Sequence, residues 1–207
     1  QRQGDYDGAL VCFEKALELV ADFPPALSNM GSISHRKNRQ DEAIQFFKRA
    51  LAIDPDYPDA HFNFSEVMLL TQPDLREGWK EHRWRWKKRE FHTQFRDFAV
   101  PLWEGSDLTG KQIAVWGEQG IGEEIMYASM VQDLMEAGAE VIVECDPRLV
   151  TLFERSFKNI KCLARTQEAP NYSEPLDFHI SMGDLGFWLR PERDSFPSRK
   201  NYLRADL

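Results

Sequence analysis

The stretch VWGEQGIGEEI, residues 115–125, combines three glycines with three glutamates and contains no lysine. An apolar segment runs into the glycines and then into a helical pattern, as in nucleotide-binding loops. Its GxxGxG order matches neither the dinucleotide motif GxGxxG nor the phosphate loop GxxxxGK[ST]. A phosphate bound there would face the carboxylates of Glu118, Glu123 and Glu124. The loop is therefore predicted to bind hydroxyl groups, or to take a proton from one.

The two glutamates that open the helix allow two interpretations. A helix N-terminus favours an ionised carboxylate, so Glu123 is a candidate general base. The plainer interpretation is that these carboxylates only complement the helix dipole, and we favour it for Glu124. The sequence does not decide whether burial beside Trp116 opposes the effect of the dipole on the pKa of Glu123.

Strands that alternate with helices are expected to position this loop. Apolar runs predict strands at 112–116, 140–145, 160–163 and 178–181, and amphipathic runs predict helices at 123–137 and 148–157. This alternation predicts a Rossmann-like parallel α/β domain over residues 112–207, with residues 99–111 as a linker. Ligands of such sheets bind at the carboxyl ends of the strands, where the 117–122 loop lies.

The first 98 residues contain an internal repeat of 34 residues. A shift of 34 positions aligns Ala9 with Ala43, Phe13 with Phe47, and Ala16 with Ala50. Paired helices with this period are typical of tetratricopeptide repeats, so residues 1–98 are predicted to form a helical solenoid that binds proteins or peptides.

Asn29 and Asn63 occupy equivalent positions in successive repeats, on helices expected to line the concave face. An asparagine amide can donate and accept at once, which suits the backbone of an extended peptide. The alternative is that each amide bonds only to the neighbouring repeat.

The segment from Trp79 to Arg96 is basic, with seven Lys or Arg residues against two glutamates. Its interleaved aromatic residues raise single-stranded nucleic acid as an alternative ligand. Trp79, Arg83 and Trp86 share one helical face, however, so a closing helix that packs against the next domain is the preferred interpretation.

Composition limits the remaining possibilities. The net charge of −8 disfavours nucleic acid and membrane surfaces as partners, and no apolar run is long enough to span a bilayer. The three cysteines form no CxxC pair and the histidines show no metal-ligand spacing, which indicates a reducing, cytoplasmic setting and no metal site. A dinucleotide-binding enzyme is a distant alternative, because the glycine pattern differs.

The segment from Pro101 to Leu149, which includes GEQGIGEEI, resembles bacterial tetratricopeptide proteins that carry a glycosyltransferase of the GT-B fold, similar to the heptosyltransferase family. The resemblance implies an acceptor-binding loop made of Gly117, Glu118, Gln119, Gly120 and Gly122. It also implies a catalytic base at Glu123, where the family has a Gly-Asp pair and this chain has Gly-Glu. The nucleotide-sugar donor is implied to bind mainly in a second Rossmann domain.

Two classes of function follow from these patterns. In the first, the chain is a fragment of a glycosyltransferase, inactive by itself, which begins within a repeat and contributes the repeats and the acceptor half for a protein or glycan acceptor. In the second, the chain is a peptide-binding scaffold whose α/β domain has no catalytic task. The reading frame beyond Leu207 would discriminate between them.

Overall fold

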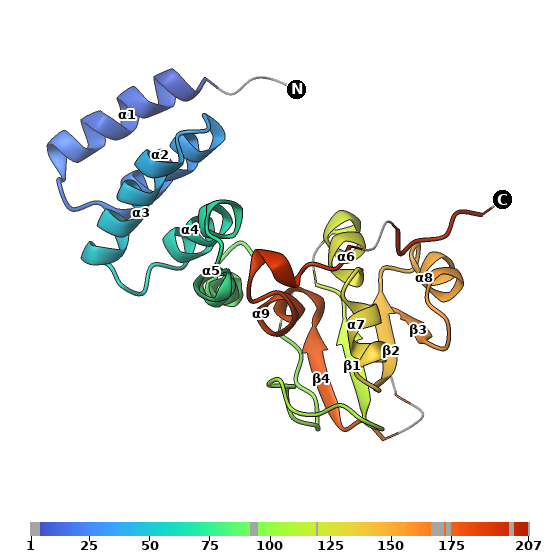
Figure 1. Ribbon diagram of the computed structural model, residues 1–207. Coiled ribbons are helices and arrows are strands. Elements are labelled where there is room, and N and C mark those ends of the chain that lie inside the picture. The colour runs from blue at the N-terminus through green and yellow to red at the C-terminus, as the bar shows by residue number, and fades with distance from the viewer. Residues whose placement is uncertain are drawn as a thin grey trace. The chain divides into compact units, whose positions relative to one another are not determined.

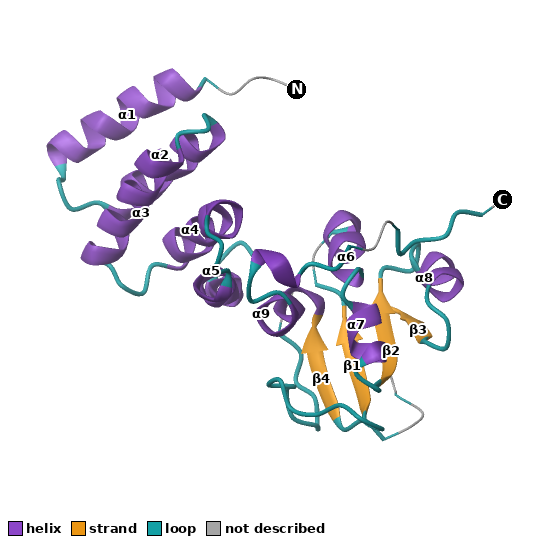
Figure 2. Cartoon of the chain, viewed as in Figure 1, coloured by secondary structure: helices purple, strands orange, loops and turns teal. Residues whose placement is uncertain are grey.

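The computed structural model describes residues 5–91, 95–118, 120–166, 172, 175–198 and 201–206. The chain divides into two compact units, Gln1–Phe91 and His92–Leu207 (Figures 1 and 2). The second unit begins earlier than the predicted boundary after residue 98, because Phe95 and Phe98 pack against its sheet.

The first unit is a series of antiparallel helices. These are α1 (Tyr6–Leu19), α2 (Pro24–Arg36), α3 (Gln40–Ile53), α4 (Pro58–Thr71) and α5 (Arg76–His82), followed by a 3-10 turn (Arg83–Lys87). Each helix packs on the next, and α2 also contacts α4. Prolines at the start of α2 and α4 suit the first helical turn, where no backbone N–H is needed, as the sequence predicts.

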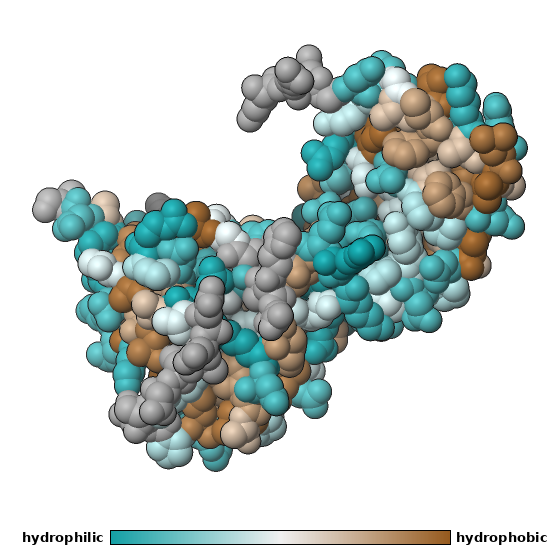
Figure 3. Space-filling view, turned by 180° about the vertical axis from the view of Figure 1, so that it is seen from behind, coloured by the Kyte–Doolittle hydropathy of each residue, from teal (hydrophilic) through white to brown (hydrophobic). Residues whose placement is uncertain are grey.

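Small residues and one phenylalanine per repeat build the core between these helices. Ala43, Phe47 and Ala50 are fully buried. Gly31 lets the Phe47 ring approach α2, because an added Cβ would lie 2.7 Å from Phe47 Cε1. The equivalent residues of α1 are only partly buried, and α1 contributes no fully buried side chain. Figure 3 shows apolar surface over this end of the unit, where Val11, Leu19, Val20 and Phe23 are exposed.

The basic segment after α4 packs into the first unit. The predicted closing helix breaks at His82 into α5 and the 3-10 turn, so the expected face of Trp79, Arg83 and Trp86 is not continuous. Trp79 is buried, and the ring of Trp84 stacks on His61 with centroids 3.8 Å apart. These two indole rings therefore pack within the unit, which disfavours their use as stacking platforms for nucleic-acid bases.

The second unit contains a parallel sheet of four strands in the order β3-β2-β1-β4. The strands are β1 (Gln112–Trp116), β2 (Glu140–Cys145), β3 (Lys161–Ala164) and β4 (Phe178–Ser181). The helices are α6 (Ile121–Ala128), α7 (Val131–Glu136), α8 (Val150–Ser156) and α9 (Leu185–Leu189), with 3-10 turns at Met182–Asp184 and Arg193–Ser195. The predicted helix 123–137 is thus two helices, separated by a turn in which Met130 N donates to Tyr127 O.

The two faces of the sheet are covered differently. Apolar residues of α7, α8 and α9 pack on one face against Val115, Val143 and Ile180, and Figure 1 shows α7 in front of β1 and β2. The other face carries the side chains of Trp116 and His179 and is covered by a nonhelical strap, residues 95–98. Phe98 of that segment stacks on His179 with centroids 4.1 Å apart. An extended strap therefore replaces a helical layer on this face.

We expect Phe47→Ala to lower the free energy of unfolding of the helical unit by about 3–5 kcal/mol, because it deletes a fully buried ring. Phe13→Ala removes the equivalent ring one repeat earlier, where burial is partial, and should cost clearly less. Urea unfolding followed by circular dichroism measures both. Equal losses would show that the two repeats contribute equally to the core.

Candidate functional site

The loop after β1 meets the end of β4 at the carboxyl edge of the sheet. Glu118 follows β1, is 7% exposed, and its Oε1 accepts a 2.7 Å hydrogen bond from Gly183 N. Gly183 lies in the turn directly after β4. The strand order reverses between β1 and β4, so this bond spans the switch point at which open α/β sheets bind ligands.

Glu124, at the same edge of the sheet, has a structural role. It is 1% exposed, and its Oε2 accepts a 2.7 Å hydrogen bond from Asp146 N, at the end of β2. Its Oε1 lies 3.0 Å from Arg165 Nη1, just beyond β3. Gly117 makes room for this carboxylate, because an added Cβ would lie 2.5 Å from Glu124 Oε1. The side chain thus ties α6 to the ends of two neighbouring strands.

Burial has the largest effect on the pKa of the Glu124 carboxyl. It raises the pKa of Glu124, while the Asp146 N–H and the charge of Arg165 oppose the shift. Glu144 on β2 is fully buried, and burial raises its pKa as well, against an ion pair with Arg96 of the strap and a hydrogen bond from Tyr172. Two arginines therefore compensate two buried carboxylates near the same strand ends.

Glu123 is exposed, and of the three glutamates it is the most accessible. It lines a cavity of about 10 Å³ together with Glu118, Glu124, Tyr127 and Met182. This volume is room for about one water molecule, so a larger ligand would have to meet Glu123 at the surface. Its catalytic role stays a prediction.

The glycines of the loop have unequal roles. Gly117 is required by the carboxylate of Glu124, as described above, whereas an added Cβ at Gly120 or Gly122 would meet no atom within 4 Å. Space around these two positions is open towards solvent. Gln119, the other predicted loop residue, lies outside the described residues.

The helical unit brings Asn63 into a local hydrogen-bond network. Its Nδ2 donates to Ser32 Oγ at 3.1 Å and to Ser28 Oγ at 3.4 Å, both on α2. The bond to the neighbouring repeat, considered above as the alternative, is therefore present for the donor half of the amide. Asn29 is exposed on α2. Peptide binding by either residue stays a prediction.

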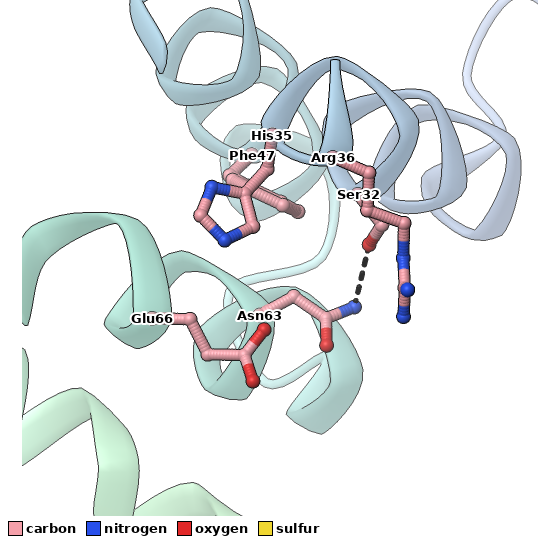
Figure 4. A pocket seen from close by; sticks show the side chains of 6 residues that line it. All are labelled: Ser32, His35, Arg36, Phe47, Asn63 and Glu66. Carbon is pink, nitrogen blue, oxygen red and sulfur yellow. Dashed lines mark hydrogen bonds between the residues drawn. The ribbon is translucent and has the colours of Figure 1, made fainter. Parts of the chain in front are cut away.

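A polar pocket of about 270 Å³ lies next to Asn63 (Figure 4). It is lined by Ser32, His35, Arg36, Phe47, Asn63 and Glu66. Sequence reasoning selected only Asn63 from this set. The signal that it missed is the helical spacing of Ser28, Ser32 and His35, which places three polar side chains along one face of α2.

The first unit is similar to a known family of repeat sequences. Residues 31–69, which run from α2 through α4, match the sequence family described as TPR repeat. They form a tetratricopeptide repeat. This confirms the helical-repeat prediction for the first unit, and the parallel sheet confirms the Rossmann-like prediction for the second.

Two further proteins are similar over larger parts of the chain. Protein FlbA of Caulobacter vibrioides is 30% identical over 224 residues, covering 98% of this chain and 37% of that protein. A mutant O-GlcNAc transferase of Thermobaculum terrenum has 16% identity and a TM-score of 0.32, covering 70% of this chain and 35% of that one. The chain therefore spans little more than a third of either protein.

Metal-ligand clusters and membrane-spanning helices are both absent from the residues that the structure describes. In that part of the chain, no group of three His, Cys, Asp or Glu side chains is placed to hold a metal ion. Within the same ranges, no helix is long and apolar enough to cross a bilayer. Cys145 and Cys162 are free and buried, and burial raises the pKa of Cys162 to about 12.

The raised pKa of Glu124 predicts a pH-dependent stability difference between the wild type and Glu124→Gln. Because the folded pKa lies above the ordinary value of 4.5, the folded wild type binds more protons than the unfolded chain between these two values. Its free energy of unfolding should therefore rise relative to the variant as the pH falls from neutral towards 4.5. Urea unfolding of both proteins at a series of pH values measures this difference.

Glu123→Gln is the matched control, since Glu123 is the exposed neighbour of Glu124. Its stability should run parallel to that of the wild type across the same pH range. A constant difference between wild type and Glu124→Gln would contradict the desolvated state of Glu124.

Proposed function

We propose that the chain recognises a protein partner through its tetratricopeptide repeats and is the acceptor-binding half of a glycosyltransferase. The observation that supports this proposal is the acidic switch point, where Glu118 and Glu123 line a small cavity with Met182 of the turn after β4. A neutral acceptor that carries hydroxyl groups suits such an edge, because carboxylates accept hydrogen bonds from hydroxyls and repel phosphates. The wider resemblance of the loop to heptosyltransferase-like enzymes is consistent with this assignment.

In this proposal Glu123 takes the proton of the acceptor hydroxyl. Glu118 and Glu124 are buried, whereas Glu123 is exposed, so Glu123 is the carboxylate that an incoming ligand can reach. Its place in the first turn of α6 favours the ionised form that a base requires. The hydrogen bond between Glu118 and Gly183 N would fix the loop after β1 against the turn after β4.

A nucleotide-sugar donor is a substrate that this edge does not fit. Its diphosphate would approach the carboxylates of Glu118 and Glu123, and no lysine or arginine lies among the cavity residues. The residues described here would orient the acceptor, and the donor would bind to a different domain of the transferase.

The alternative is a non-catalytic scaffold in which only the repeats bind a partner. The polar pocket beside Asn63 supports recognition by the repeats in both cases. The two functions therefore differ only in whether the second unit takes part in catalysis.

In a protein that joins this chain to a donor-binding domain, we expect Glu123→Gln to lower kcat by about 10²–10⁴-fold, the usual contribution of a positioned base. The thermal stability and donor affinity should be unchanged, since Glu123 is exposed. Sugar transfer measured with a radiolabelled donor provides the rate.

Glu140→Gln is the matched control, because Glu140 is exposed at the opposite, amino-terminal end of β2. This variant should retain full activity. Equal, small effects of both substitutions would reduce Glu123 to a charge at the helix terminus and would favour the scaffold.

A further inference from the structure

Around Asn63 the pocket presents hydrogen-bond acceptors, because the donors of Asn63 and Ser32 are already used. Asn63 Nδ2 donates to Ser32 Oγ, and Ser32 Oγ donates to Ser28 O at 3.1 Å. The amide nitrogen of Asn63 thus donates to α2 of the neighbouring repeat. The carbonyl oxygen of this side chain accepts no hydrogen bond from any residue that the structure describes, and Figure 4 shows this oxygen turned away from Ser32.

The ring of His35 is oriented by Gln40. His35 Nδ1 lies 2.7 Å from Gln40 Oε1, while Gln40 Nε2 donates to Asn38 Oδ1 at 3.3 Å. An amide oxygen only accepts hydrogen bonds, so Nδ1 carries the proton. Nε2 of the neutral ring is then a second acceptor. Glu66, one turn after Asn63 on α4, adds an exposed carboxylate as the third.

An ammonium group has three N–H donors and a positive charge, and therefore complements three acceptors of which one is a carboxylate. In the view of Figure 4, His35 and Glu66 lie to one side of Asn63 and Arg36 to the other. In this view the guanidinium of Arg36 lies across Asn63 from His35 and Glu66, where it can meet an anionic group of the ligand.

We propose that this pocket binds a lysine side chain of an extended polypeptide, and that Arg36 pairs with an acidic residue of the same segment. This inference rests on the proposed recognition role of the repeats and specifies the chemistry of the partner. Alternate side chains of an extended peptide point to the same face, so a lysine and an aspartate two positions apart reach the repeat surface together.

The test uses synthetic peptides of glycine and serine that carry one lysine and, two positions later, one aspartate. Binding to the ¹⁵N-labelled chain is measured by NMR titration, which detects weak affinity and locates the site. We expect shifts at His35, Asn63 and Glu66, and about tenfold weaker binding of the same peptide with acetyl-lysine, which keeps the stem but removes the charge.

A charge swap makes the test specific. Glu66→Lys should weaken the lysine peptide about tenfold or more and should instead favour a peptide with glutamate in place of lysine. Glu14→Lys is the matched control, an exposed glutamate of α1 outside the pocket, and should leave the lysine preference unchanged.

The outcomes separate this inference from the function on which it rests. Peptides that bind at the repeats with equal affinity for lysine and acetyl-lysine would overturn the lysine pocket and leave recognition by the repeats standing. Failure of every peptide to shift residues of α2 and α4 would overturn both. Loss of lysine preference in Glu66→Lys with a gain for glutamate would support the assignment.

Discussion

The strand order β3-β2-β1-β4 is the constraint on which the second unit depends. Because all four strands are parallel, their carboxyl ends meet at one edge, and β4 lies beside β1 although the two are far apart in sequence. Glu118 can therefore bond to Gly183, and the loop of Glu123 stands next to the turn after β4. The sheet thus determines the position of the glycine-rich loop. The acidic character of this edge comes from the side chains that the sheet brings together.

The same edge shows why adjacent glutamates are not equivalent. The carboxylate of Glu124 points inward and loses its hydration. The hydrogen bond from Asp146 N and the ion pair with Arg165 compensate this desolvation, and both partners are needed. Glu123 remains exposed at the surface, where a ligand can reach it. The buried carboxylate also explains Gly117, since a Cβ there would collide with it. A conformational requirement of the backbone is not needed to account for this glycine.

Periodicity allowed most of the elements to be predicted from the sequence, whereas contacts between distant residues were not predictable. The 34-residue repeat and the apolar runs located the helical unit and the four strands, because burial imposes both patterns. The helix breaks after Ala128 and His82 were missed, since packing decided them against continuous helical patterns. At the site, the loop was found through its glycines. The partners Arg165 and Gly183 were not, because nothing local in the sequence marks them.

Asn63 shows how one side chain can satisfy two interpretations that seemed exclusive. Its N–H₂ group bonds across to Ser32 and stabilises the packing of α2 against α4, which is the local role. That bond also fixes the amide orientation and leaves the carbonyl oxygen as an acceptor beside His35 and Glu66. The structural contact therefore prepares the binding surface. A repeat can in this way set the hydrogen-bonding character of its groove through residues that also hold its helices together.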